Sequence, residues 1–193
     1  MLEEAFWAGA LPARLEYGTF DSKAFPDRAT VVRACYTRTH LLLRYDAPYT
    51  TLSTFEPPIL DRERAGLWDR DVVEAFIGTD PKNPKTYYEF EVAPTNEKLD
   101  LVISPEIPDV GKRLEWSSAF ESAVKLDETR KVWTTLMRIP LHSLSKTLVR
   151  PGTRWRINFY RIDRASGAFL AWNPTLTRSY HEPERFGWLE FRD

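Results

Sequence analysis

Short runs of β-branched and aromatic residues, bounded by turn-forming residues, recur along the chain and constrain its fold more than any other feature. We expect about ten strands from these runs. They cover residues 30–36, 41–46, 72–78, 86–92, 99–103, 119–126, 131–139, 155–162, 168–172 and 186–191. No long segment has a helical period, and residues 140–144 predict only one helical turn. The pattern predicts an all-β fold, an antiparallel β-sandwich or jelly roll with minor helical turns, as a single domain over residues 1–193.

Charge and composition exclude several classes of function. The formal net charge is −1, which argues against non-specific binding of nucleic acid and gives no reason to expect a membrane surface as partner. No run approaches the roughly 18 apolar residues of a membrane span. Cys35 is the only cysteine, so no intramolecular disulfide forms, and we expect a buried, inert thiol. Residues 1–7 lack the features of a secretory signal, so either the protein is cytoplasmic or a signal has been removed.

A polar loop that leads into an apolar strand is the clearest candidate for a site. Trp68 lies in the loop, and the strand that follows places Glu74 between Val72 and Phe76 on one face. An unpaired buried carboxylate is costly, so Glu74 needs either a ligand or an arginine partner. Trp68 is either an exposed platform for a ligand or an anchor of the loop. The chain has seven tryptophans, an unusually high number, which suggests that some of the rings are exposed for binding.

The sequence offers little support for catalysis or for a metal. Asp71 and Glu74 are three apart, so a strand points them to opposite faces and they cannot act together as a glycosidase pair. Asp69 and Asp71 either cap the loop or contribute to a structural calcium site. Met137 and a distant histidine are the only obvious axial ligands for a haem. The three histidines, His40, His142 and His181, have no metal-ligand spacing, so we assign no catalytic residue and no metal ligand.

Five motifs, in order, give the chain a family resemblance. Residues 68–77 resemble the W-x-D-D-x-V-E-x-F-I segment of carbohydrate-binding module family 9-like domains, and residues 88–94 resemble the Y-x-F-x-V-x-P strand. Residues 133–141 are similar to the W-x-x-E-x-x-I-P-x segment, without its acidic residue. Residues 155–161 are similar to the W-R-x-N-F-x-R strand, and residues 172–174 and 186–189 to the W-x-P and F-G-x-L signatures. The resemblance spans roughly residues 28–191.

The resemblance implies a non-catalytic β-sandwich that binds a terminal pyranose between two tryptophans. Carried over by motif, Trp68 and Trp172 would be the two rings, Glu74 and Asn158 would bond the sugar hydroxyls, and Arg161 would be a further candidate. Arg161 faces away from Asn158 in a regular strand, so both can join one site only at a bulge or a strand end. Aromatic rings cover the C–H faces of a sugar, and polar groups bond its hydroxyls.

The resemblance also implies a setting for the domain. It suggests a secreted or periplasmic protein, a saccharide ligand and a polysaccharide-degrading enzyme, encoded elsewhere, as partner. Related folds include haem-binding proteins, and some members hold structural calcium. Because fold does not fix function, a structural or protein-interaction module with a vestigial sugar site remains the alternative.

Overall fold

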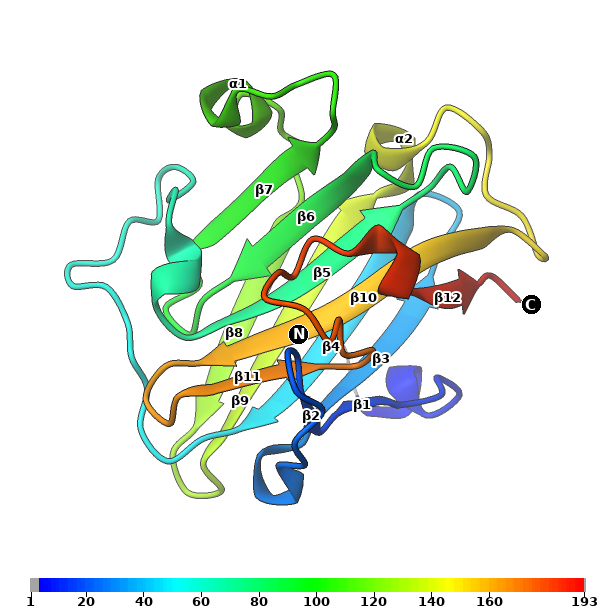
Figure 1. The fold of residues 1–193 in the computed structure, drawn as a ribbon. Helices are drawn as coiled ribbons and strands as arrows, with labels where there is room; N and C mark the ends of the chain where they lie inside the picture. Colours follow the sequence, from blue (N-terminus) through cyan, green and yellow to red (C-terminus); the bar gives the residue numbers. More distant parts are fainter. Residues whose placement is uncertain (1–3, 193) are drawn as a thin grey trace.

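Two antiparallel β-sheets pack face to face in the computed structural model, which describes residues 4–192 (Figure 1). The five-stranded sheet has the order β1 (Ala13–Leu15), β3 (Thr30–Tyr36), β4 (His40–Pro48), β9 (Val132–Pro140) and β8 (Glu121–Asp127). The seven-stranded sheet has the order β2 (Tyr17–Gly18), β11 (Ala168–Ala171), β10 (Arg154–Asp163), β5 (Val72–Gly78), β6 (Tyr87–Val92) and β7 (Lys98–Ile103), and β12 (Gly187–Glu190) also pairs with β10.

Helical structure is confined to short pieces. The α-helical turns are α1 (Val110–Leu114) and α2 (Leu141–Leu144), and the 3-10 turns are η1 (Glu4–Trp7), η2 (Pro26–Arg28), η3 (Leu67–Asp69) and η4 (Pro183–Arg185). Within residues 4–192 no helix is long and apolar enough to cross a membrane.

The predicted all-β sandwich is confirmed, with two additions. The short strands β1 and β2, which pair with β3 and β11, lie outside the ten predicted runs. Helix α1 also lies outside the predicted elements, and at its start the Asp109 side chain accepts a hydrogen bond from the Lys112 backbone N–H at 3.3 Å. The prediction of one domain over residues 1–193 extends to residues 1–3 and 193, which lie outside the described residues.

The core lies between the two sheets. Strand alternation turns Val73, Ala75 and Ile77 of β5 inward, where they meet the inward residues of the five-stranded sheet. Burial of such apolar surface stabilises the fold by about 25 cal/mol per Å². The hydroxyl of Tyr45, on β4, donates a hydrogen bond of 2.8 Å to the carbonyl oxygen of Glu74, which fixes one sheet on the other beside the candidate site.

The outer face of the seven-stranded sheet is also covered. Residues 173–186, the covering segment, cross in front of β10 and β5 (Figure 1). The His181 ring stacks on Phe76 with centroids 5.4 Å apart, and the Tyr160 hydroxyl donates to the carbonyl oxygen of Tyr180 at 2.9 Å. Every residue of β5 is therefore buried, on both faces of the strand.

Candidate functional site

Three glutamates meet on the outer face of the seven-stranded sheet. Glu74 on β5 lies directly opposite Glu91 on β6, and Glu89 lies two residues further along β6 on the same face. On the other side of Glu74, its register partner on β10 is Tyr160. We call Glu74, Glu89 and Glu91 the carboxylate cluster. Side chains alternate between the two faces of a strand, so the pairing of β5 with β6 in this register places all three side chains on one face.

The carboxylate cluster is buried and has no basic partner. Glu74 is 3% exposed, Glu89 5% and Glu91 0%, and no ion pair reaches any of them within the described residues. Burial, and then the charge of Glu89, raise the pKa of Glu74 well above its usual range. Burial likewise raises the pKa of Glu89 to about 7. The pKa of Glu91 rises well above its usual range through burial and then through the charges of Glu74 and Glu89.

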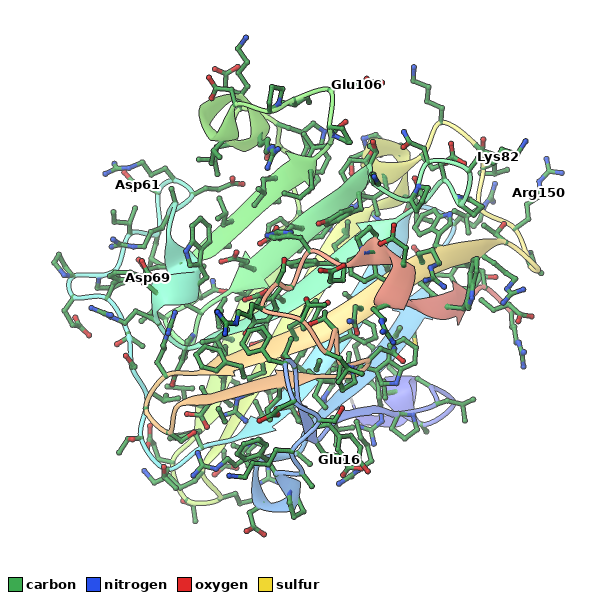
Figure 2. The ribbon with its side chains drawn as sticks, in the orientation of Figure 1. Glu16, Asp61, Asp69, Lys82, Glu106 and Arg150 are labelled. Carbon is green, nitrogen blue, oxygen red and sulfur yellow. The ribbon has the colours of Figure 1, made fainter. Side chains whose placement is uncertain are left out.

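Trp68 lies beside this face on η3. Gly66 precedes the turn with φ +79°, a left-handed conformation that glycine adopts without strain, and the Trp68 side chain is left 37% exposed. The Arg164 guanidinium, from the β10–β11 turn, donates to the Trp68 carbonyl oxygen at 3.1 Å and lies 3.8 Å from the Asp69 carboxylate. Figure 2 shows Asp69 at the edge of the molecule, at the η3 end of the sheet. Arg164 also lowers the pKa of Glu74, so it lies within electrostatic reach of the cluster.

A series of rings continues from Arg164 across the outer face. Arg164 lies over the Phe169 ring at 5.1 Å, and Phe169 is 5.7 Å from Phe20. Phe20 meets Tyr180 edge-on at 5.2 Å, and Tyr180 meets Tyr160 edge-on at 4.9 Å. The negative charge of Glu74 raises the pKa of both tyrosines, after burial, so both lie within electrostatic reach of Glu74. The outer face thus combines apolar rings with carboxylate acceptors, the two elements that bind a sugar.

Asn158, predicted as a hydroxyl partner, lies on the outer face but has all its bonding capacity engaged. Its side-chain amide donates to the Tyr160 hydroxyl at 2.7 Å and to the Asn173 carbonyl oxygen at 2.8 Å. Its side-chain oxygen accepts from the Asn173 backbone N–H at 3.0 Å. Asn158 is 0% exposed and anchors the start of the covering segment.

Arg161 and Trp172 lie away from the carboxylate cluster. Arg161 is 1% exposed and faces inward, where it donates to the Thr30 hydroxyl at 3.1 Å and pairs with Asp163 at 3.4 Å. The Trp172 ring packs toward the core against Phe159, with centroids 5.7 Å apart. Among the described residues, no ring contact joins Trp172 to Trp68. The structure therefore brings Trp68 and Glu74 to the outer face together with Asn158, and places Arg161 and Trp172 on the other side of the sheet.

The residues considered above for catalysis, a calcium site or a haem ligand make contacts within the fold. Asp71 accepts hydrogen bonds from the backbone N–H groups of Ser53 at 3.0 Å and Arg164 at 2.7 Å. Met137 is 1% exposed in the core between the sheets. Across residues 4–192, no three histidine, cysteine, aspartate or glutamate side chains are grouped so as to hold a metal ion.

Sequence reasoning did not single out Glu89, Glu91, Tyr180 or Arg164 for the site. For the two glutamates a signal exists, because they alternate with apolar residues over 87–92 and so share one strand face. Tyr180 and Arg164 carry no such signal, since a loop and a turn bring them to the face.

Comparison with known proteins places the chain in a family. Residues 17–193 match the model of the family described as carbohydrate family 9 binding domain-like. A relative called "Extracellular protein", from Arthroderma benhamiae, is 29% identical over 175 residues, which is 83% of this chain and 77% of the relative. A carbohydrate-binding module of family 9 from Caldicellulosiruptor kristjanssonii, solved with cellotriose, has a similar fold with a TM-score of 0.69 at 12% identity, over 100% of this chain and 87% of that chain. A structure of a family 9 module from the same organism, solved with glucose, gives 0.66 at 13% identity, over 100% and 88% of the two chains. The family match covers most of the sequence, and the structural matches share the sandwich: this chain belongs to the carbohydrate family 9 binding domain-like family.

Proposed function

We propose that this domain binds the terminal pyranose of a mono- or oligosaccharide at the outer face of the seven-stranded sheet, without cleaving it. Trp68 stacks on the C–H face of the sugar, and Glu74 accepts hydrogen bonds from its hydroxyl groups. Asn158 contributes indirectly, because it holds the covering segment beside the site. A partner enzyme that degrades the polysaccharide, encoded elsewhere, belongs to the same proposal.

One observation carries the proposal: the Glu74 carboxyl group on the outer face has no protein donor, and the partly exposed Trp68 lies on η3, the turn that contacts β6 of the same sheet. Trp68 is 37% exposed, whereas Trp7 and Trp133 are 1% and 0% exposed in the core. The Glu74 side chain makes no hydrogen bond and no ion pair within residues 4–192. Buried polar groups are nearly always hydrogen-bonded, so the unpartnered carboxyl group of Glu74 supports a ligand that supplies the donor.

The arrangement favours binding over hydrolysis. A glycosidase places two carboxyl groups on either side of the scissile bond. Here Glu74, Glu89 and Glu91 all project from one face of one sheet, so they meet a sugar from a single side. The family description, a binding domain, agrees with this reading.

Calorimetric titration with glucose, cellobiose and cellotriose tests the proposal. Trp68→Ala removes the stacking surface and should weaken binding about tenfold or more, since such contacts contribute on the order of 1 kcal/mol beyond their buried area. Trp188→Ala is the matched control, because Trp188 is 44% exposed at the other end of β10, where Arg154 and Arg156 flank its ring. Binding that survives Trp68→Ala unchanged would show that the site is elsewhere.

The near-complete burial of the carboxylate cluster favours a second function. A sandwich whose outer face is permanently closed would serve as a structural or protein-interaction module with a vestigial sugar site. The same titration decides between the two, because the second function requires that no saccharide binds the wild-type protein.

A further inference from the structure

A cavity of about 680 Å³ opens between the two sheets at one edge of the sandwich. The five-stranded sheet ends at β1 on this edge, and β12 pairs with β10 alone among the described strands. Side chains of both sheets line the cavity, among them Val32 and Ala34 on β3 and Ile157 and Phe159 on β10. Cavities of roughly 300–1,000 Å³ are the size that holds small ligands.

Short strands and small side chains leave this edge of the sandwich unfilled. β1 is three residues long and β12 is four. Ala13 on β1 and Ala34 on β3 face the core and line the cavity, where a larger side chain would occupy the space. Leu11 and Trp188, which also line the cavity, are 87% and 44% exposed. Exposed apolar surface around a cavity marks a place where a ligand or partner binds.

The lining of the cavity suits an apolar molecule. Apolar surface of Tyr36 and Trp172 lies along it, and its charged lining residues are Glu190 and Arg192. These two neutralise each other, because Arg192 donates to both carboxylate oxygens of Glu190 at 3.1 and 3.2 Å. The hydroxyl groups of a saccharide need many polar partners and are costly to bury without them. The cavity therefore calls for a different ligand class from that of the proposed saccharide site.

Positive charge lies at the mouth of the cavity. The guanidinium groups of Arg154 and Arg156 lie 4.4 and 4.8 Å from the centroid of the Trp188 ring. Arg156 donates to the carbonyl oxygens of Pro183 and Glu184 at 3.1 and 2.7 Å. The Arg154 side chain makes no hydrogen bond and no ion pair within residues 4–192. An arginine with open N–H groups binds a carboxylate through two parallel hydrogen bonds.

We propose that this cavity binds an apolar carboxylic acid, with its hydrocarbon body between the sheets and its carboxylate against Arg154. The body covers the apolar walls, and the head group pairs with the open guanidinium group beside Trp188. The site shares no residue with Trp68 or Glu74, so it is independent of the proposed saccharide site.

Calorimetry at pH 7 with octanoate, decanoate and 2-naphthoate, all below micellar concentrations, tests this inference on the wild-type protein. Decanoate should bind with one-to-one stoichiometry and about tenfold more tightly than octanoate, because it buries two more methylene groups. Decyltrimethylammonium has a chain of the same length with the opposite charge, so it should bind about tenfold less tightly than decanoate. The comparison of decanoate with 2-naphthoate shows whether the cavity prefers a chain or a flat ring system.

Variants locate the site. Ala34→Phe fills the cavity and should weaken decanoate binding tenfold or more, whereas Ala123→Phe adds the same ring at an exposed position on β8 and should not. Arg154→Gln should reduce the preference for decanoate over decyltrimethylammonium several-fold. Arg130→Gln is its control, because the Arg130 side chain is 75% exposed at the β8–β9 turn. Should Ala34→Phe fail to fold, the Arg154 pair still decides.

Three outcomes would overturn the inference. The first is that neither decanoate nor 2-naphthoate binds the wild-type protein. The second is equal binding of decanoate and decyltrimethylammonium, and the third is unchanged decanoate affinity in a folded Ala34→Phe protein. Cellotriose titrated into the same variants reports on the proposed function separately, because its binding should not respond to Ala34→Phe or to Arg154→Gln.

Discussion

At the scale of single residues, two tryptophans that look alike in the sequence have different surroundings. Trp68 is left 37% exposed by a 3-10 turn, whereas Trp172 is half-buried against Phe159. Gly187 makes room for the Trp172 ring, because a Cβ atom at that position would lie 2.4 Å from it. The first ring is partly exposed to solvent, and the second packs against the edge of the core.

This difference predicts opposite phenotypes for the two alanine variants. Trp172→Ala leaves a cavity and should lower the free energy of unfolding by about 2–4 kcal/mol while leaving sugar affinity within twofold of wild type. Trp68→Ala should leave the free energy of unfolding nearly unchanged and lose the affinity. Urea unfolding and calorimetric titration on both proteins check the pair. A folded Trp172→Ala protein that no longer binds sugar would return Trp172 to the site.

Residue types and strand faces were predictable from the sequence, but their partners were not. Alternation places Glu74 and Phe76 on one face and Val73 on the other, and the structure confirms these faces. The partner of Asn158 is Asn173, fifteen residues away on a loop whose path no periodicity encodes. The exposure of Trp68 and of Trp172 likewise depends on which residues pack over each ring. Those tertiary contacts cannot be derived from a single sequence. The assignment of site residues therefore stays a prediction.

At the scale of elements, one side chain joins three segments that border the site. Asp71 bonds the backbone of Ser53 in the long link before η3 and the backbone of Arg164 in the β10–β11 turn. Arg164 in turn bonds the carbonyl oxygen of Trp68. The position of Trp68 thus depends on the Asp71 carboxylate, which bonds two backbone N–H groups.

We expect Asp71→Asn to weaken sugar binding through η3. The amide keeps one acceptor oxygen, so at least one buried backbone N–H loses its partner, at a cost of about 1–3 kcal/mol. Hydrogen exchange should rise at residues 50–56 and 164–167, and the sugar affinity should fall several-fold. Asp127→Asn is the matched control, because Asp127 accepts from the backbone N–H groups of Thr129 and Arg130 at the β8–β9 turn. A drop in affinity of equal size in both variants would mean that general destabilisation, and not the position of η3, is responsible.

At the scale of the whole molecule, buried carboxyl groups link the stability of the fold to pH. Besides the carboxylate cluster, Glu63 and Asp100 form a second close pair, in which the backbone N–H of Asp100 donates to Glu63 at 3.4 Å. Burial, and then the charge of Asp100, raise the pKa of Glu63 to about 7. Glu63 and Glu89 therefore both retain a proton in the folded protein at a pH where the unfolded chain has lost it.

The sign of this linkage predicts that the protein is most stable in mild acid. A carboxyl group whose pKa is raised by folding contributes its full stabilisation below its unfolded pKa, near 4.5, and loses it as the pH rises through about 7. The melting temperature should therefore fall between about pH 5 and pH 8. Glu63→Gln keeps a neutral side chain at every pH, so its melting temperature should fall less over this range, whereas Glu128→Gln, at an exposed turn, should follow the wild-type curve. Thermal unfolding monitored by circular dichroism at half-unit pH intervals measures both slopes. A wild-type melting temperature that rises over this interval would show that the raised pKa values do not govern the stability of the fold.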